Sequence, residues 1–500
     1  MRQNTKKRII SAIAALTLSL TYILSQPINT YATEVEDSSS SGDRDYMAEA
    51  EARKGEAIQS NEIDNWPRGP QVGAEGAIVM EVNTGAILYA KNIDEHLYPA
   101  STTKVLTTLV AMEHCQSLDE MVSFSQEAVF GIERGSSNMG MDVGQSITME
   151  QCLYGILVYS ANEVCNAVAE HCAGSIDGFV EMMNQKAAEL GCTNSHFVTT
   201  NGLHDEQHYT TPRDLATIGC EFFKNETLSK MAGTRHYYIG PTATQPDDID
   251  LYTHNKLTAG TYPYEGYIGG KTGYTTVSRQ TLVSCAERNG VRLVCVIMKE
   301  ESPNQFLDTI TLFDYGFDNF SRLNIAENET DFTMENSELF ETDSDIFFSS
   351  APITEIDPNG YVVIPNTASF EDLDKTISYL TDEEAAAAGG TGGADRLARI
   401  DYTYRDQKVG SAYVKLTEEK ENEVGDITIL SDENDYSEDA GKRVIFINVL
   451  KVVGIVAAVF GIILVIILII SIAKNYSFGR RRSDRRRRKR WKSRDPFDRL

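Results

Sequence analysis

The order of hydrophobic patterns between residues 76 and 298 limits the fold more than any other feature of the chain. Two strand-like segments open this stretch and two more close it. The first two flank the turn Asn83-Thr84-Gly85, and the last two flank the turn Asn289-Gly290. Apolar residues at helical spacing occupy the middle. We therefore expect an α/β (α+β) domain with helices packed on an antiparallel sheet built from both ends of the stretch. The expected strands are 77–82, 86–90, 281–286 and 291–298, and the expected helical blocks begin after Pro99 and cover about 149–172 and 176–190, the last ending at Gly191.

A smaller region follows the main domain. The segments 361–364, 399–405 and 411–416 look like short strands and predict a small β-rich domain. Acidic segments on both sides of the folded part hold few large apolar side chains, so they cannot bury enough surface to become ordered. The predicted layout is a signal peptide (1–32), a disordered acidic linker (33–65), a main domain (66–325), the small β-rich domain (326–416), an acidic linker (417–443), a transmembrane helix (452–473) and a basic cytoplasmic tail (474–500).

Both ends of the chain carry apolar runs. Basic residues from Arg2 to Arg8 precede an uncharged, mostly apolar stretch at 9–24, and Ala32 offers a small residue for cleavage, as in a secretory signal peptide. A retained signal anchor is the alternative, because a small-x-small cleavage pattern is missing. The run 452–473 has no charged residue and is long enough to span a hydrocarbon core as a helix. Since basic residues follow it, the sequence predicts an exported, single-pass cell-membrane protein whose tail stays in the cytoplasm.

The net charge and the cysteine spacing limit which binding partners, metals and cofactors we expect. The formal net charge is −27 although the tail at 474–500 is strongly basic, so the expected exported part is strongly acidic, which favours solubility and keeps it off anionic lipid. We expect no nucleic-acid partner. Beside a membrane span, the basic tail favours a role in lipid attraction and topology over nucleic-acid binding. All eight cysteines lie between residues 115 and 295 without CxxC or zinc-ligand spacing. We expect mostly reduced core cysteines, no metal site and no cofactor.

A possible nucleophile and base lie one helical turn apart. In Ser101-Thr102-Thr103-Lys104 the first and last residues share one face of the expected helix. A serine hydroxyl becomes a good nucleophile when a neighbouring base takes its proton, and a lysine can be that base when its surroundings lower its pKa. The pattern alone is weak, because a capping serine with a surface lysine has the same spacing.

Two later tripeptides, taken together with the first pattern, indicate a catalytic site. Ser160-Ala161-Asn162 ends an apolar run in the helical block, and Lys271-Thr272-Gly273 leads into a late strand. Alone, each is an ordinary polar turn or strand entry. The three patterns together, in this order and on these elements, form the signature of penicillin-binding proteins and serine β-lactamases.

The segments around the three motifs indicate which family the chain resembles. The chain resembles the low-molecular-mass penicillin-binding proteins of the serine D-alanyl-D-alanine carboxypeptidase family (peptidase family S11), closely over residues 70–319 and more loosely over the following β-rich domain. The segments that carry the resemblance are Gly76 to Gly85, Leu88 to Asn92, Tyr98 to Lys104, Asn201-Gly202-Leu203 with His208-Tyr209, Thr211 to Asp214, Lys271 to Thr275 and Asp314 to Phe317.

The resemblance implies a two-step reaction on peptidoglycan stem peptides that end in D-alanyl-D-alanine. Ser101 would attack the carbonyl between the two D-alanines and form an acyl-enzyme that water hydrolyses, with Lys104 as general base. Ser160 would relay the proton to the leaving amine. The backbone N–H groups of Ser101 and Tyr274 would form the oxyanion hole. β-Lactams, which resemble the substrate's end, would acylate Ser101 covalently.

The resemblance also implies the substrate-binding residues. Asn162 would hold the substrate amide, Lys271 would keep the site electropositive near Ser160, and Thr272 would hydrogen-bond the terminal carboxylate. Gly273 and Tyr274 complete this expected set.

Two departures from the family pattern concern the same region. Ser278-Arg279 stands where the family commonly has Ala-Gly, and His254 stands where it commonly has a basic residue. Arg279 is then either a partial ligand of the substrate carboxylate or a solvated strand residue.

Three alternative functions share parts of this pattern. A β-lactamase of the commonest class needs a Glu-x-x-Leu-Asn loop after the second motif, whereas residues 195–201 read Ser-His-Phe-Val-Thr-Thr-Asn, so slow deacylation of penicillin is expected. A D,D-endopeptidase or transpeptidase would use the same catalytic residues. An inactive wall-binding receptor is disfavoured by the intact motifs and by a tail too short for a folded signalling domain.

Overall fold

The structure is a computed structural model that describes residues 44–329, 354–381 and 396–416. Four predicted segments lie outside these ranges: the signal peptide at 1–32, the acidic linker at 417–443, the transmembrane helix at 452–473 and the basic tail at 474–500. Among the described residues, none of the helices has the length and apolar character needed to cross a membrane.

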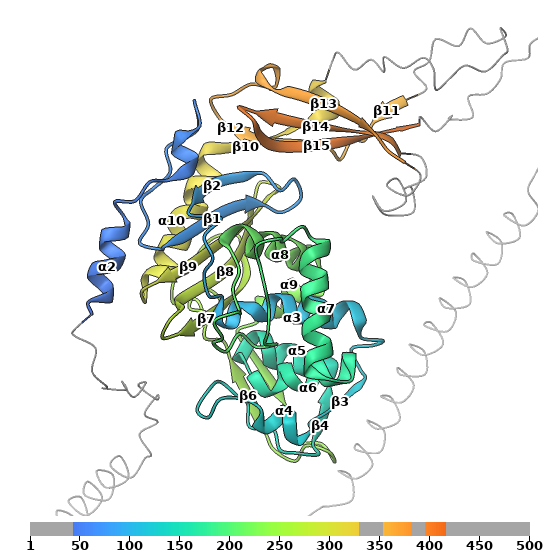
Figure 1. Ribbon diagram of the computed structural model, residues 1–500. Helices are drawn as coiled ribbons and strands as arrows, with labels where there is room; N and C mark the ends of the chain where they lie inside the picture. Colours follow the sequence, from blue (N-terminus) through green and yellow to red (C-terminus); the bar gives the residue numbers. More distant parts are fainter. Residues whose placement is uncertain (1–43, 330–353, 382–395, 417–500) are drawn as a thin grey trace, which may run out of the picture. The chain divides into compact units, whose positions relative to one another are not determined.

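An antiparallel five-stranded sheet forms the centre of the main domain, in the order β2-β1-β9-β8-β7. Both predicted hairpins are confirmed, and their neighbouring strands β1 and β9 join the two ends of the domain in one sheet (Figure 1). At the second turn Asn289 and Gly290 both have positive φ, as a tight two-residue hairpin requires. The strands are β1 (Gly76–Glu81), β2 (Ile87–Lys91), β7 (Tyr267–Thr275), β8 (Arg279–Arg288) and β9 (Val291–Glu300).

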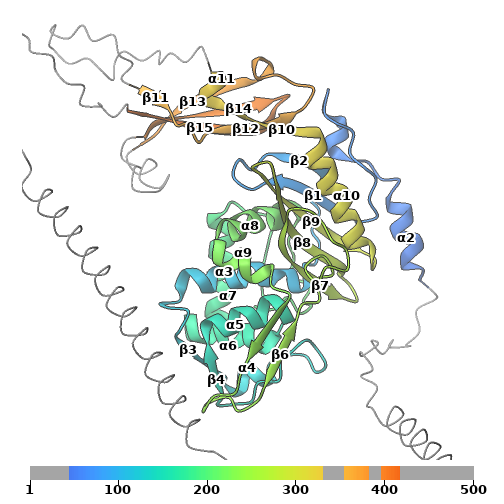
Figure 2. The same cartoon turned by 180° about the vertical axis from the view of Figure 1, so that it is seen from behind.

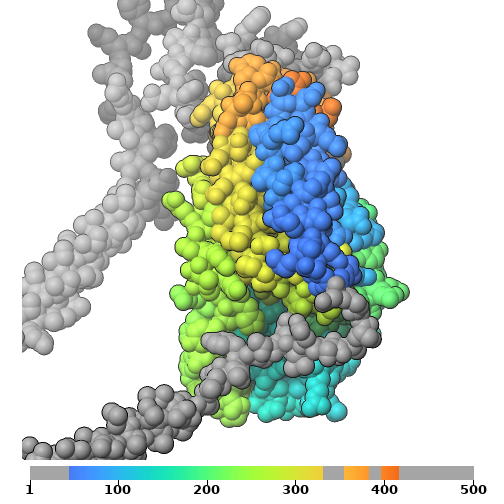
Figure 3. Space-filling view, turned by 90° about the vertical axis from the view of Figure 1, so that its left-hand side faces the viewer, coloured from blue at the N-terminus to red at the C-terminus, as the bar shows by residue number. Residues whose placement is uncertain are grey.

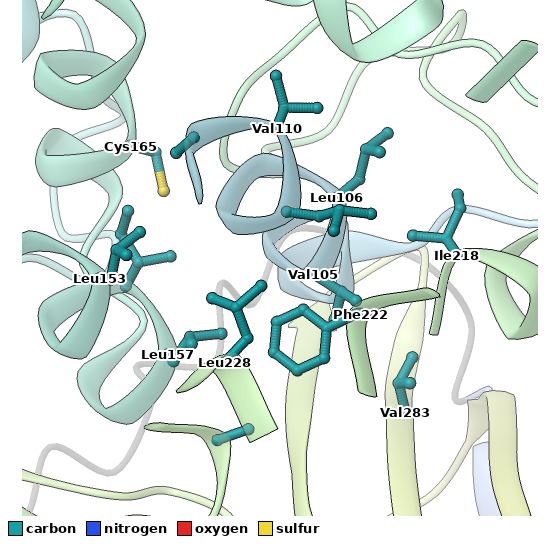
Figure 4. Close-up of a cluster of buried hydrophobic side chains, with 14 of the residues drawn as sticks. Val105, Leu106, Val110, Leu153, Leu157, Cys165, Ile218, Phe222, Leu228 and Val283 are labelled. Atoms are coloured by element: carbon teal, nitrogen blue, oxygen red, sulfur yellow. The ribbon is translucent and has the colours of Figure 1, made fainter. Parts of the chain in front are cut away.

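Helices cover one face of this sheet and enclose the larger core. Figure 2 shows them on the side of the sheet opposite to α10 (Asn304–Asn319). Helix α3 (Lys104–His114) lies in the middle of this group, and Val105, Leu106 and Val110 pack among side chains of the other helices and of the sheet (Figure 4). The other helices are α4 (Gln126–Phe130), α5 (Met149–Tyr154), α6 (Asn162–Ala173), α7 (Ile176–Glu189), α8 (Pro212–Lys224) and α9 (Glu226–Ala232).

The helical block predicted at 149–172 is interrupted. Helix α5 passes into a π-helical turn, η3 (Gly155–Tyr159), and Ser160 then adopts a left-handed conformation with φ of 68° before α6 begins. Such a conformation is costly for a residue with a side chain, and it is found where the surroundings hold it for a purpose. The predicted third helix is confirmed, and Gly191 after it has φ of 77°.

The expectation of a disordered linker over 33–65 is wrong for its described part, residues 44–65. Helix α2 (Tyr46–Arg53) and the short 3-10 turn η1 (Gln59–Glu62) are ordered, and Figure 3 shows this blue segment lying along the yellow α10. Arg53 donates hydrogen bonds to the carbonyls of Gly73 and Lys299, and the buried Lys91 ammonium donates to the Arg53 carbonyl. Composition suggested disorder because large apolar residues are few here, but the buried Ala50 and Ile58 and the backbone hydrogen bonds of Arg53 hold the segment in place.

The three strands predicted after residue 326 lie in a second antiparallel sheet, in the order β10-β12-β15-β14-β13 with β11 paired to β15. This sheet begins earlier than expected, because β10 lies before residue 326 and pairs with β12. The strands are β10 (Phe320–Asn324), β11 (Thr354–Ile356), β12 (Tyr361–Pro365), β13 (Asp374–Tyr379), β14 (Arg396–Tyr404) and β15 (Gln407–Leu416).

Candidate active site

The structure brings the first motif into hydrogen-bonding contact. Ser101 lies in the 3-10 turn η2 (Ala100–Thr103), which continues directly into α3, so its side chain and that of Lys104 point the same way. The distance between Lys104 Nζ and Ser101 Oγ is 2.8 Å. The nucleophile and the base expected from the spacing are therefore within proton-transfer distance.

Lys104 is fully buried and bound by three oxygens. Besides Ser101 Oγ, its Nζ lies 2.7 Å from Asn162 Oδ1 and 2.6 Å from the Asn201 carbonyl. Burial lowers the pKa of the Lys104 ammonium to about 8, because the charged form loses its hydration. In about one eleventh of the molecules, the Lys104 side chain is therefore a neutral amine at pH 7, and this form can act as a general base.

The second and third motifs meet through Ser160. Its left-handed backbone turns its hydroxyl toward β7, where Lys271 Nζ lies 3.0 Å from Ser160 Oγ. Lys271 is 3% exposed and also donates to the Thr272 carbonyl at 2.8 Å. Burial, followed by the nearby charge of Lys104, lowers the pKa of Lys271 well below its usual value. Two lysines, two serines and one asparagine thus form one continuous polar site.

Gly273 lets β7 approach the nucleophile. A Cβ atom at this position would lie 2.3 Å from Thr281 Oγ1 and 2.9 Å from the backbone nitrogen of Ser101. Thr281 in turn donates to the Pro99 carbonyl at 2.9 Å, which ties β8 to the turn that carries Ser101. Tyr274 follows Gly273 directly, so the two backbone N–H groups expected to form the oxyanion hole belong to segments in close contact.

A buried histidine that sequence reasoning gave no role supports the nucleophile's turn. His208 Nδ1 accepts hydrogen bonds from the backbone N–H groups of Val198 and Thr199, so its proton lies on Nε2. Nε2–H donates to Thr103 Oγ1 at 2.8 Å, and Thr103 donates to the Ala100 carbonyl at 2.8 Å. Burial lowers the pKa of His208 to about 3, which keeps this orientation at neutral pH.

The hydrogen bonds from His208 and Thr103 support a strained backbone segment directly before the nucleophile. Ala100, directly before the nucleophile, has φ of 50°, a conformation that L residues rarely adopt. Gly202 lies so close that a Cβ there would be 1.8 Å from the Ala100 carbonyl oxygen. The segments around 201 and 208 were part of the family resemblance, and this resemblance was the one sequence signal that pointed to them.

Arg279 is not the solvated strand residue that one of its two interpretations assumed. Its Nε and Nη2 atoms each lie 2.7 Å from Glu301, and its side chain is 15% exposed, so it is not a solvated strand residue. The guanidinium carbon lies 3.9 Å from the ring centre of Tyr46 on α2. The remaining nitrogen, Nη1, lies 3.4 Å from the Tyr274 hydroxyl at the rim of the site. Arg279 thus joins the N-terminal helix to the active-site strand, with most of its donors already used.

His254 is the other departure from the family pattern, and it lies beside the site. Its ring centre is 5.3 Å from that of Tyr159, which precedes Ser160. Burial, followed by the charge of Lys271, lowers the pKa of His254.

Within the described ranges, no group of three or more His, Cys, Asp or Glu side chains is arranged to hold a metal ion. All eight cysteines carry free thiols, six of them buried.

Comparisons with known proteins agree with this geometry. Residues 63–302 match the peptidase S11 family, described as D-alanyl-D-alanine carboxypeptidase. The chain is 34% identical over 259 residues to the D-alanyl-D-alanine carboxypeptidase DacB2 of Mycobacterium tuberculosis, which covers 50% of this chain and 84% of that protein. It is 32% identical over 252 residues to DacF of Bacillus subtilis, with 49% of this chain and 63% of that protein covered. The matched part thus spans less than two thirds of the Bacillus relative.

The fold agrees as well. The structure of penicillin-binding protein 5 from Haemophilus influenzae superposes with a TM-score of 0.54 and 24% identity, covering 70% of this chain and 98% of that one. The catalytic domain therefore has the penicillin-binding-protein fold. With the three motifs assembled in one site and matched relatives of this identity, the chain belongs to the D-alanyl-D-alanine carboxypeptidase family, peptidase S11.

Proposed function

We propose that the protein is a serine D-alanyl-D-alanine carboxypeptidase that removes the terminal D-alanine from peptidoglycan stem pentapeptides. The observation that carries the proposal is the contact between Ser101 Oγ and the buried amine of Lys104, next to the Ser160–Lys271 pair. Relatives with this activity in their names match over 252 and 259 residues of the chain. The reaction needs no cofactor, because the nucleophile, the base and the proton relay are all side chains of the chain itself.

Acylation begins when the neutral Lys104 amine takes the proton of Ser101. The serine oxygen attacks the carbonyl carbon between the two D-alanines, and the developing oxyanion is held by the backbone N–H groups of Ser101 and Tyr274. The proton that Lys104 took passes back through the Ser160 hydroxyl to the nitrogen of the leaving D-alanine, so that the C–N bond breaks and Lys104 is neutral again. Water then hydrolyses the ester on Ser101 and restores the free enzyme.

Substrate binding uses the groups around this centre. Thr272 hydrogen-bonds the terminal carboxylate of the peptide, and the Lys271 ammonium keeps this end of the site positive. Asn162 holds the substrate amide while its Oδ1 also contacts Lys104. A substrate carboxylate next to Lys271 would stabilise that lysine's charged form, since opposite charges at short distance favour the ionised state.

A β-lactamase function is disfavoured. Residues 195–201 offer no glutamate that could activate a deacylating water, and Ser195 uses its hydroxyl to contact Asp214 and Thr210. We expect β-lactams to acylate Ser101 and to leave slowly. A D,D-endopeptidase or transpeptidase would differ only in the bond cleaved or in the acceptor of the second step, and a product assay separates these reactions.

We further propose that the protein is exported and held on the cell membrane by residues 452–473, with the tail at 474–500 in the cytoplasm. The uncharged run and the basic residues after it support this orientation. Protease added outside intact cells should remove the catalytic domain and leave the tail. A tail digested under these conditions would reverse the proposed topology.

Two measurements test the enzymatic proposal. Fluorescent penicillin should label the wild-type chain and not Ser101→Ala, and equal labelling would exclude Ser101 as the nucleophile. D-Alanine released from a pentapeptide ending in D-alanyl-D-alanine tests the reaction itself. Good penicillin labelling without D-alanine release would instead favour endopeptidase or transpeptidase activity.

A further inference from the structure

A two-stranded hairpin beside the catalytic site presents an exposed aromatic face. Strands β5 (His236–Ile239) and β6 (Ile249–Tyr252) pair antiparallel, so alternate side chains point to opposite faces. On the inner face, Ile239 and Leu251 are buried in the core, and the ring of Tyr237 stacks on Tyr154 at 3.8 Å. In Figures 1 and 2, β6 lies beside the helices rather than in the central sheet.

The outer face, here termed the hairpin platform, consists of His236, Tyr238, Asp248, Asp250 and Tyr252. The residues Tyr238 and Tyr252 are 52% and 58% exposed, and the ring of His236 stacks on that of Tyr252 with ring centres 4.4 Å apart. Asp250 accepts a hydrogen bond from His236 Nε2 at 2.7 Å, and Asp248 accepts one from the Tyr238 hydroxyl. Exposed aromatic rings gathered on one face are unfavourable in water and indicate a binding surface.

The platform is held firmly at both ends. At the base of the hairpin the backbone N–H of Thr253 donates to the Arg235 carbonyl at 3.1 Å. At its tip Thr244 Oγ1 donates to the Ser146 carbonyl at 3.0 Å, and the Ser146 N–H donates to the Thr244 carbonyl at 3.2 Å. A ligand would therefore meet rings that are already oriented, which lowers the entropic cost of binding.

The platform lies beside the active site, because β6 packs against η3, which ends directly before Ser160. Two residues after Tyr252, the ring of His254 packs on Tyr159, and Tyr159 directly precedes Ser160. A polymer bound on the platform would therefore lie near the catalytic centre.

The aromatic rings and carboxylates of the platform favour a sugar polymer as its ligand. A sugar ring offers an apolar C–H face that packs on an aromatic ring and hydroxyl groups that donate to carboxylates. Asp248 and Asp250 repel polyanions such as nucleic acids. We propose that the hairpin platform binds the glycan strand that carries the stem peptide, an N-acetylated amino-sugar polymer. This proposal rests on the proposed function, and it would direct the enzyme to polymeric wall rather than to soluble peptide.

Two substrates compared on the same variants test the proposal. The full chain in detergent would be assayed for D-alanine release from a soluble pentapeptide and from polymeric peptidoglycan with pentapeptide stems. Replacing both tyrosines (Tyr238→Ala with Tyr252→Ala) should lower the ratio of kcat/KM on polymer to kcat/KM on peptide about tenfold, given typical aromatic contact energies. Tyr379→Ala, which removes a 41% exposed tyrosine on β13, is the matched control and should leave this ratio unchanged.

A binding measurement separates the platform from the catalytic proposal. Peptide-free glycan strands should retain the wild-type chain and Tyr379→Ala, and should release the double variant. An unchanged ratio, or retention that the double variant keeps, would overturn the platform. Loss of polymer activity in the double variant without retention of the wild type on peptide-free glycan would also overturn the platform as a glycan site. If wild type releases no D-alanine from either substrate, the enzymatic proposal fails while the retention result still decides the platform.

Discussion

The buried amine of Lys104 makes the rate of acylation depend on pH in a defined way. Burial lowers the pKa of Lys104 to about 8, and only the neutral amine can take the proton of Ser101. The acylation rate should therefore rise with pH up to about 8 and level off above it. His208 does not titrate in this range, because its pKa lies near 3.

The expected size of the change in acylation rate with pH follows from the fraction of Lys104 that is a neutral amine. With a pKa of about 8, that fraction is about one hundredth at pH 6, about one eleventh at pH 7 and one half at pH 8. The second-order rate constant for acylation should thus rise about fiftyfold from pH 6 to pH 8 and at most about twofold beyond.

The assay follows fluorescent penicillin bound to the chain against time at each pH, with circular dichroism as a check that the fold persists. Lys104→Arg is the matched variant, since its guanidinium stays charged, and its rate should be lower by about a hundredfold or more at all pH values. A wild-type rate that does not change between pH 6 and 9 would refute the role of Lys104 as base. A midpoint near 6.5 would point to a histidine instead.

Three further predictions concern packing. Gly273→Ala should slow acylation about a hundredfold while the chain still folds, because the new methyl group would push β7 away from Ser101; an unchanged labelling rate would contradict this. Tyr46→Ala should lower the free energy of unfolding by about 1 kcal/mol in urea titration, through loss of the stacking on Arg279, whereas Met47→Ala on the exposed side of α2 should cost less than about 0.5 kcal/mol. A thiol reagent should react rapidly with at most the two half-buried cysteines of the folded chain and with all eight in denaturant, and fewer than eight thiols in denaturant would indicate a disulfide.

The sequence predicted the parts of the fold that depend on local pattern. Alternation and turn residues located both hairpins of the central sheet, and the Ser-x-x-Lys spacing placed Ser101 and Lys104 on one turn. These features are readable because neighbours along the chain define them. The π-helical turn before Ser160 was missed, since its apolar residues follow the same spacing as an ordinary helix.

The chemistry of the site was decided by tertiary structure. Spacing could name Lys104 as a base, but its low pKa exists because tertiary packing removes water from the side chain. In the same way, Arg279 is held by Glu301 and by Tyr46 on a helix that composition had assigned to a linker. The sequence by itself thus determined which groups could react. Their burial, orientation and charge depend on residues far apart in the chain, and no local period records such contacts.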